Sequence, residues 1–425
     1  MVVGSGSAGC QVLVVPKQTV LIIAGGTGGH IVPGLGLALE FAQSTQPAYD
    51  VLFLSLEKNR TYADFADVPF PVHFYAAPPI TKQPLALLEF PLRFARALWQ
   101  AWRLLRAHDV SFVIGMGGYS IFPGIVAARL TGVPYYLCEQ NAVPGRATRL
   151  FAGGARRIFL NFPVAAKHQT ADFTEGRVVL AGNPLRPKLR LSAGTQPGAS
   201  GRSKKAAVGN TKKTKQIVRK QKNGQKIKSK LKINRRGAAE DLTVLVLGGS
   251  QGAAQINAMV AAAISELSPR PVGRWIIQCG EKNLEQMRAQ LPPKKYPNVT
   301  LLGYHPAIHE FYRTADLVIC RAGAGVLSEA LVFGLPMILI PYPYAADNHQ
   351  LANAVYLSER GVAHCISQTG TEPAELIHVI REWSGSARAQ IETRSQLAAA
   401  LARPDAAAEI LAEIQADAGA ATTAS

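Results

Sequence analysis

Three short stretches of this sequence combine glycines with a side chain that can hydrogen-bond or exchange a proton. They are residues 25–30 (GGTGGH), 115–120 (GMGGYS) and 248–252 (GGSQG). Glycine permits positive φ and close approach of the backbone to a ligand, and a helix that begins there offers free N–H groups. A single turn of this kind could be rich in glycine simply because the backbone turns tightly. Three such turns, carrying His30, Ser120 and Ser250, favour a site for an anionic ligand.

The stretch at 320–354 (CRAGAGVLSEALVFGLPMILIPYPYAADNHQLANA) is the most specific in the chain. A turn of small residues at 322–325 follows an apolar run, and the helical pattern after it carries Ser328 and Glu329. The amides of the turn can face a diphosphate, and the Glu329 carboxylate can accept hydrogen bonds from a ribose diol. This half of the chain is therefore predicted to hold a nucleotide.

Two common nucleotide-binding motifs do not fit. From Gly26 the chain has GTGGHI, so Ile31 stands where the dinucleotide fingerprint G-x-G-x-x-G needs its last glycine. The acid after the second expected strand, Glu57, comes later than the usual ~20 residues. No G-x-x-x-x-G-K-[ST] motif occurs in the sequence. An NAD-dependent dehydrogenase is kept only as a distant alternative.

The elements that must position these turns alternate along the chain. Apolar runs with strand character occupy 19–24, 49–55, 111–116, 134–139 and 156–161, and helical patterns fall at 32–43, 85–107 and 121–131. The alternation starts again with a strand at 241–249 and a helix at 252–266, and later strands are expected at 274–280, 298–304, 316–323 and 336–342. This order predicts an α/β protein with two Rossmann-like, doubly wound parallel-sheet domains facing a cleft. Ligands of such sheets bind at the carboxyl ends of the strands.

The chain of 425 residues is too long for one hydrophobic core, and we expect five parts. They are an N-terminal extension (1–18), an N-terminal Rossmann-like domain (19–188), a basic low-complexity insertion (189–240), a C-terminal Rossmann-like domain (241–403), and a C-terminal helix with a tail (404–425).

Most of the net charge of +18 lies in one segment. Residues 191–240 contain 15 Lys or Arg, a single acidic residue and almost no large apolar side chain, so we expect the segment to be disordered. Contact of its lysines with anionic lipid is the alternative; nucleic-acid binding would rest on this segment alone and is not expected. Five scattered cysteines and the lack of an apolar run of 18 residues fit a reduced cytoplasmic protein without a membrane span.

Six ordered motifs carry a resemblance to a known family. Besides GGTGGH and the 320–354 stretch, they are GGYSIFPG (117–124), EQNAVPGRATR (139–149), AGNPLR (181–186) and GGSQGA (248–253). With these motifs the chain resembles the bacterial peptidoglycan glycosyltransferases often called MurG. These are the UDP-N-acetylglucosamine:N-acetylmuramyl-(pentapeptide) pyrophosphoryl-undecaprenol N-acetylglucosamine transferases.

The resemblance implies an inverting glycosyltransferase of the GT-B fold. Its C-terminal domain would hold UDP-N-acetylglucosamine, and its N-terminal domain would take the lipid-linked acceptor, lipid I, giving lipid II on the cytoplasmic face of the inner membrane. The nearest alternative is another GT-B enzyme that glycosylates a lipid such as diacylglycerol. The family's donor contacts fall on Thr27, Gly28, Gly29, Asn141, Arg186, Ser250, His305, Ala324, Gly325, Val326, Leu327, Ser328, Glu329 and Gln350.

The resemblance also implies which groups do the chemistry. An inverting transfer needs a base for the acceptor's 4-hydroxyl, and His30 is the candidate because the ordinary pKa of histidine lies near neutrality. The alternative is that His30 only hydrogen-bonds the substrate or caps its helix. Ser250, the amides of 248–252 and Arg186 could stabilise the departing UDP. The sequence contains no D-x-D, so we expect no strict requirement for a metal or another cofactor.

Residues 85–108 (LALLEFPLRFARALWQAWRLLRAH) mix large apolar side chains with four arginines and a single acid, Glu89. A helix of this composition can place apolar side chains among lipid tails and arginines against anionic headgroups. The alternative is a core helix with a solvated face. A polyprenyl-linked acceptor favours peripheral contact with an anionic membrane.

Overall fold

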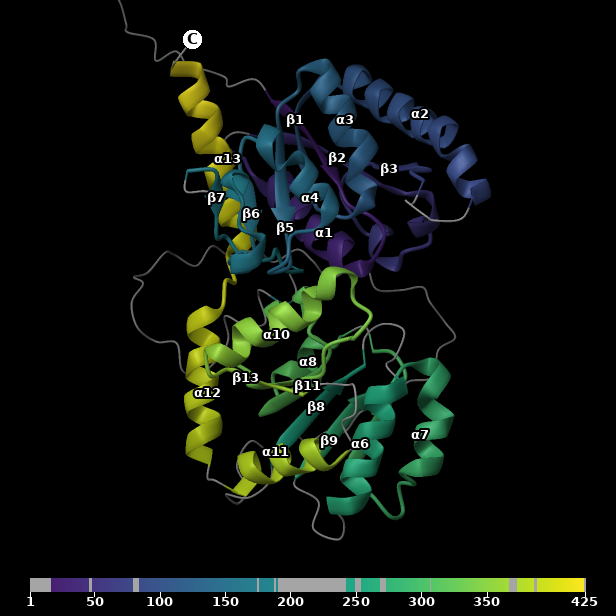
Figure 1. Ribbon diagram of the computed structural model, residues 1–425, viewed down its shortest axis with the longest axis vertical. Helices are drawn as coiled ribbons and strands as arrows, with labels where there is room; N and C mark the ends of the chain where they lie inside the picture. Colours follow the sequence, from purple (N-terminus) through teal and green to yellow (C-terminus); the bar gives the residue numbers. More distant parts are fainter. Residues whose placement is uncertain are drawn as a thin grey trace, which may run out of the picture.

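Two parallel sheets, each covered by helices, lie one above the other in the computed structural model of the chain (Figure 1). The structure describes residues 17–45, 48–78, 84–173, 176–186, 189, 242–248, 254–267, 273–305, 307–366, 373–385 and 388–423. The expected extension at 1–18 lies outside this set except for Lys17 and Gln18, and the expected basic insertion at 189–240 lies outside it except for Leu189. The turn at 249–253, with Ser250, also lies outside the described residues.

The N-terminal sheet has seven described strands in the order β3-β2-β1-β4-β5-β6-β7, and all pairs are parallel. The strands are β1 (Gln18–Ile23), β2 (Tyr49–Leu56), β3 (Val72–Tyr75), β4 (Val110–Gly115), β5 (Tyr135–Glu139), β6 (Ile158–Leu160) and β7 (Val178–Val179). The helices around it are α1 (Gly28–Gln43), α2 (Pro84–Ala107), α3 (Phe122–Thr131) and α4 (Arg146–Phe151).

The C-terminal sheet repeats this arrangement with six described parallel strands in the order β10-β9-β8-β11-β12-β13. They are β8 (Thr243–Leu247), β9 (Arg274–Gln278), β10 (Val299–Leu302), β11 (Leu317–Cys320), β12 (Met337–Leu339) and β13 (Ala363–Cys365). Its helices are α6 (Ala254–Leu267), α7 (Leu284–Gln290), α8 (His309–Tyr312), α9 (Ala324–Val332), α10 (His349–Glu359), α11 (Pro373–Gly385) and α12 (Arg388–Leu401).

Strand β1 shows why the central strands could be predicted from apolar runs in the sequence. Leu21 and Ile23 belong to the apolar cluster on one face of the sheet, and Val20 and Ile22 belong to the cluster on the other face. Successive side chains point to opposite faces, so a strand covered on both sides is apolar at consecutive positions over most of its length. The expected α/β architecture of two Rossmann-like parallel sheets is confirmed.

Three strands were not expected from the sequence, and one helix begins earlier than expected. Strands β3 and β7 lie at the edges of their sheet and are mostly half-buried, and β13 is a three-residue edge strand, so none gives a long apolar run. Helix α1 begins at Gly28 rather than at residue 32. Its first turn therefore includes the glycines of the turn, and His30 lies in that turn.

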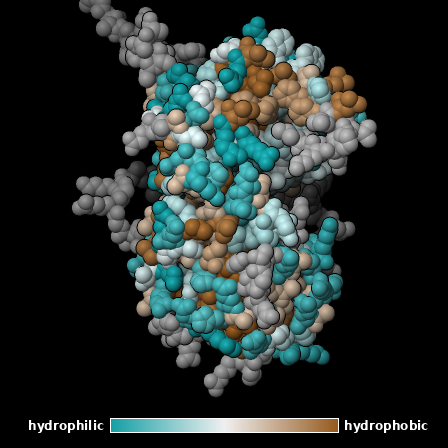
Figure 2. Space-filling model, viewed as in Figure 1, coloured by the Kyte–Doolittle hydropathy of each residue, from teal (hydrophilic) through white to brown (hydrophobic). Residues whose placement is uncertain are grey.

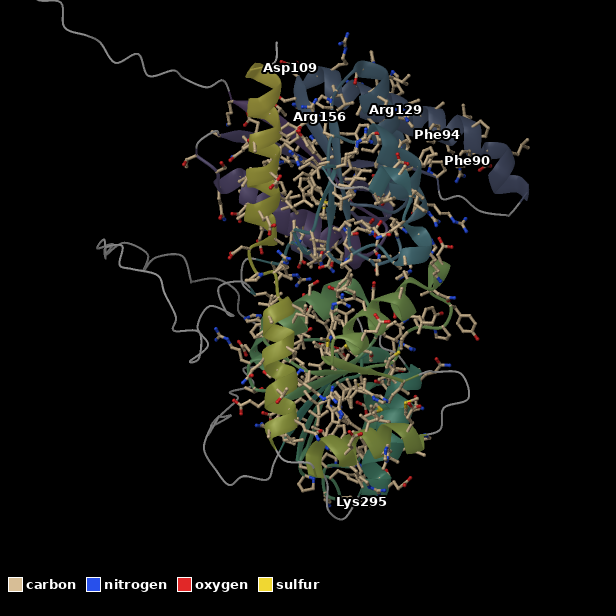
Figure 3. The ribbon with its side chains drawn as sticks, turned by 60° about the vertical axis from the view of Figure 1, so that its left-hand side comes forward. Phe90, Phe94, Asp109, Arg129, Arg156 and Lys295 are labelled. Atoms are coloured by element: carbon tan, nitrogen blue, oxygen red, sulfur yellow. The ribbon has the colours of Figure 1, made fainter. Side chains whose placement is uncertain are left out.

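The C-terminal helix α13 (Ala406–Thr423) returns to the N-terminal domain (Figure 1). Ile410 and Ile414 are buried in the same cluster as β1. The Tyr136 hydroxyl and the Arg156 guanidinium both donate to the Asp417 carboxylate, at 2.8 and 2.9 Å (Figure 3 shows Arg156 beside this helix). Helix α12 stays with the C-terminal sheet, so the joint between α12 and α13 connects the two domains.

Candidate active site

The strand order of the N-terminal sheet brings its two glycine turns together. In each sheet the chain reverses direction across the sheet between two central neighbours, β1 and β4 in one and β8 and β11 in the other. Open α/β sheets bind ligands at this switch point, beyond the carboxyl ends of the strands. The turns at 25–30 and 115–120 follow β1 and β4, and those at 248–252 and 322–325 follow β8 and β11. The N-terminal domain therefore places both of its turns at its switch point, and the C-terminal domain places the turn at 322–325 there.

The two N-terminal turns pack directly against each other. Gly117 and Gly118 have φ of +88° and +70°, and a Cβ on Gly118 would lie 3.1 Å from Cε1 of His30. Both positions require glycine, for backbone conformation and for space. The buried Ser120 hydroxyl donates to the carbonyls of Gly25 and Gly117, at 3.3 and 3.4 Å. Ser120 therefore joins the turns rather than facing a ligand.

His30 keeps part of its surface exposed, and its Nδ1 lies 3.4 Å from Oγ1 of Thr27. Burial, followed by the charge of His349, lowers the pKa of His30 to about 4. The N-terminus of α1 acts in the same direction, because a helix dipole disfavours a cation there. The imidazole is therefore neutral near pH 7, with one nitrogen able to accept a proton. His349 begins α10 of the other domain, so His30 lies where the domains meet.

Glu329 is the corresponding ionisable group of the C-terminal domain. It lies on α9, and its Oε2 accepts a hydrogen bond of 3.0 Å from the Tyr312 hydroxyl. Burial raises the pKa of Glu329, while the Tyr312 hydrogen bond and the charge of Arg186 act in the opposite direction. Ala324 and Leu327 of the same helix are buried, so their side chains face the core and leave only backbone groups for a ligand. Gly325 and Val326 complete the first turn of α9.

Arg186 and Asn141 both lie at the junction of the domains. Nη2 of Arg186 is 3.0 Å from Oδ2 of Asp64. The Asn141 amide nitrogen donates to Glu139, and its Oδ1 accepts from Asn353 at 3.1 Å. Asn353 is fully buried and also bonds the backbone of Ala142 and Ala322. The loop that carries Asn141 is thereby tied to the start of the α9 turn.

Three predicted donor contacts have protein partners in the structure. The buried Ser328 hydroxyl donates to Oδ1 of Asn161 across the interface, at 3.2 Å, and to the Ala324 carbonyl. Nδ1 of His305 accepts from the Ala307 amide at 3.2 Å. Oε1 of Gln350 accepts from the Tyr342 amide at 2.9 Å. Thr27, Gly28 and Gly29 stand at the start of α1, beside His30.

Sequence reasoning missed Tyr312, Asp64 and Asn353, and it gave His349 no role. His349 and Asn353 fall inside the motif-rich 320–354 stretch, which is the one signal that could have found them. Glu57, the late acid of the rejected dinucleotide fingerprint, accepts hydrogen bonds from Nε and Nη2 of Arg60, at 2.6 and 2.8 Å.

Comparison with known proteins gives the chain a family. The N-terminal domain model of glycosyltransferase family 28 matches residues 20–160, and the C-terminal domain model matches residues 243–410. A UDP-N-acetylglucosamine--N-acetylmuramyl-(pentapeptide) pyrophosphoryl-undecaprenol N-acetylglucosamine transferase of Leptospira interrogans is 34% identical over 365 residues, covering 85% of this chain and 89% of the relative. The chain belongs to this transferase family.

Two further relatives support the assignment of the chain to this family. The transferase of the same name from Burkholderia cenocepacia is 31% identical over 402 residues, covering 93% of this chain and 95% of the relative. The crystal structure of Acinetobacter baumannii MurG superposes with a TM-score of 0.67 at 25% identity, covering 94% of this chain and 99% of that chain. These relatives bear out the GT-B fold and the glycosyltransferase class.

Proposed function

We propose that this chain transfers N-acetylglucosamine from UDP-N-acetylglucosamine to the 4-hydroxyl of N-acetylmuramic acid in lipid I, undecaprenyl-pyrophosphoryl-MurNAc-pentapeptide. The products are lipid II and UDP, with inversion at the anomeric carbon, as a step of peptidoglycan synthesis. The observation that carries the proposal is the contact between α1 and α9, the helices of His30 and Glu329. His30, the proposed base, and Glu329, the proposed nucleotide-binding carboxylate, lie on the two helices that meet at this domain junction.

The donor is proposed to bind mainly to the C-terminal domain, 241–403, and the acceptor to the N-terminal domain, 19–188. Glu329 would accept from the ribose, and the amides at the start of α9 would face the diphosphate. Arg186 lies at the junction and would leave Asp64 for a phosphate oxygen. The remaining predicted contacts complete this proposed site: Thr27, Gly28, Gly29, Asn141, Ser250, His305, Ala324, Gly325, Val326, Leu327, Ser328 and Gln350.

In the proposed reaction the neutral imidazole of His30 removes the proton of the acceptor's 4-hydroxyl. The oxygen forms a bond to the anomeric carbon from the face opposite UDP, and the bond from that carbon to the phosphate oxygen breaks with its electron pair. Arg186, the α9 amides and the 248–252 turn with Ser250 would stabilise the negative charge on UDP. Binding of the anionic substrates near His30 would raise its pKa and make it a stronger base.

The reaction is proposed to need no metal or other cofactor strictly. Within the described residues, no group of three or more His, Cys, Asp or Glu side chains could hold a metal ion. Arg186 and helix N-terminal amides can supply the electrostatic stabilisation of a diphosphate that a metal gives elsewhere. We expect transfer to continue in excess chelator, and loss of transfer that Mg²⁺ restores would contradict this part of the proposal.

Helix α2 is proposed to hold the protein on the anionic cytoplasmic face of the inner membrane. Leu88 and Leu92 are 82% and 78% exposed, and Trp99 is 55% exposed. Figure 2 shows apolar side chains gathered over α2, and Figure 3 shows Phe90 and Phe94 on the same helix. None of the helices that the structure describes is long and apolar enough to cross a membrane. The exposed apolar surface supports peripheral contact instead.

Vesicle flotation tests the membrane contact. The double variant Leu88→Ser with Leu92→Ser is expected to lose most of its binding to vesicles containing anionic lipid. Leu130→Ser is the matched control, because Leu130 is 71% exposed but belongs to α3 rather than to α2. Deletion of 191–240 tests whether the lysines of that segment contribute to vesicle binding. Unchanged binding after the deletion would assign the membrane contact to α2.

Product analysis tests the function itself. The protein is mixed with labelled UDP-N-acetylglucosamine and either lipid I or diacylglycerol in detergent. We expect the label in lipid II and unlabelled diacylglycerol. Label on diacylglycerol would support the alternative lipid glycosyltransferase, and no transfer to either acceptor would contradict the proposal.

A further inference from the structure

The position of Tyr312 suits a residue that acts on a ligand through another side chain. It is the last residue of α8 and is only 1% exposed. Its ring stacks on Phe333, with centroids 5.4 Å apart and planes 10° from parallel. Packing of the ring fixes the direction of its hydroxyl, which donates to Oε2 of Glu329 at 3.0 Å. A rigid donor therefore points at a flexible carboxylate.

The hydroxyl of Tyr312, like that of Tyr136 on Asp417, donates to a carboxylate rather than to a backbone carbonyl. A buried hydroxyl must find an acceptor, and a backbone carbonyl is sufficient for that need. Tyr135 illustrates the ordinary solution, because its hydroxyl donates to the Phe151 carbonyl at 2.8 Å. Tyr312 instead bonds an ionisable side chain of α9, the helix that begins at the C-terminal switch point.

The geometry leaves Glu329 able to bind a ligand. An ionised carboxylate has two oxygens with about four lone-pair positions, and the last torsion of glutamate is broad and weakly fixed. The hydrogen bond from Tyr312 occupies one lone pair of Oε2. Oε1 and the rest of Oε2 remain for a vicinal diol, held in one orientation.

The hydrogen bond also acts against the effect of burial on the carboxylate. Burial raises the pKa of Glu329, and the Tyr312 hydroxyl and Arg186 counteract this effect. Burial and the nearby Glu329 raise the pKa of Tyr312 well above its ordinary value, so Tyr312 remains a donor. A protonated Glu329 would lose acceptor capacity toward a diol.

We propose that Tyr312 is a positioning residue for the donor nucleotide, which orients the Glu329 carboxylate for the two ribose hydroxyls of UDP. This inference rests on the proposed function, because it takes the C-terminal domain as the UDP site. It assigns to Tyr312 a share of the specificity for ribose over deoxyribose, although the tyrosine itself does not touch the nucleotide.

Binding calorimetry with UDP and with 2′,3′-dideoxy-UDP tests the proposal. In Tyr312→Phe the Kd for UDP is expected to rise about tenfold, as for loss of one hydrogen bond to a charged group. The Kd for dideoxy-UDP should stay unchanged, because no diol is there to meet Glu329. Tyr296→Phe is the matched control: its hydroxyl donates to Ser265 at 3.2 Å in the same domain, and it should change neither Kd.

Two further measurements separate positioning from general packing. In a Glu329→Gln background, Tyr312→Phe should weaken UDP binding by much less than tenfold, because the two side chains act as a unit. The pH below which UDP affinity falls should also move upward in Tyr312→Phe, since loss of the hydrogen bond raises the pKa of Glu329. Equal weakening of UDP and dideoxy-UDP, or additive effects of the two substitutions, would overturn the proposal.

The test needs no acceptor and no transfer. If wild-type protein binds UDP but does not glycosylate lipid I, the proposed function fails while the role of Tyr312 can still be measured. If wild-type protein does not bind UDP, the proposed function itself is contradicted.

Discussion

The two domains order their central strands in the same way around a switch point, yet they present different side chains there. The N-terminal site has His30, whose pKa is lowered by burial and by His349. The C-terminal site has Glu329, whose pKa is raised by burial but pulled back by Tyr312 and Arg186. Burial favours the neutral form of both groups, and only the carboxylate has neighbours that act against this effect. The same strand arrangement thus carries a neutral imidazole in one domain and a buried carboxylate in the other, which are the proposed base and the proposed acceptor.

The largest expected effect comes from removing the base of the N-terminal site. His30→Ala should lower kcat about 100-fold or more, the usual contribution of a general base. The Kd for UDP should stay within a few-fold of wild type, because the nucleotide is held from the other domain. Single-turnover rates and calorimetry on the same sample measure the two quantities. If UDP affinity holds and turnover survives within tenfold, His30 only holds substrate.

The matching change in the C-terminal site is Glu329→Gln. It should raise the Kd for UDP roughly 10- to 100-fold, since hydrogen bonds to a charged group contribute about 1.5–3 kcal/mol. At saturating donor, kcat should change far less than in His30→Ala. An unchanged Kd for UDP in this variant would show that Glu329 is not part of the donor site. It would also contradict the proposed division of roles between the two domains.

Replacement of a glycine tests the comparison between the two sites without replacing an ionisable group. In Gly118→Ala the new Cβ meets the His30 ring, so the ring must move and kcat should fall about tenfold. Gly132→Ala is the matched control: Gly132 also has positive φ, +73°, but open space around its Cβ. Both variants should lose similar thermal stability from strain. Equal kcat values in the two variants would show that the contact between Gly118 and His30 does not matter.

The smallest effect is expected from pH. With its pKa lowered to about 4, His30 of the free enzyme stays unprotonated down to mildly acidic pH. The value of kcat/KM should therefore be flat between about pH 6 and 8 and fall only near the lowered pKa. Bound anionic substrates raise the pKa of His30, so the acid limb of kcat should lie at higher pH than that of kcat/KM. Identical limbs in both profiles would argue against protonation of His30 as their cause.

Sequence alone determined the parts of this protein that depend on local pattern. The central strands β1, β4, β8 and β11 are apolar over most of their length because both faces of each sheet are covered, so they could be predicted from the sequence. The glycine turns after them and the six motifs followed from the order of residues, and they led to the transferase family. Edge strands β3 and β7 were missed, since a short, half-buried strand needs no long apolar run.

Tertiary structure alone decided which of these parts meet. Strands β1 and β4 are neighbours in space, although 86 residues separate the end of β1 from the start of β4. Only this pairing places His30 against Gly117 and Gly118. The lowered pKa of His30 comes from burial and from His349 of the other domain, and the setting of Glu329 comes from Tyr312 and Arg186. Charge and hydrogen bonding act through space over a few ångströms, so groups distant in the chain fix the chemistry of a site whose location the sequence could already indicate.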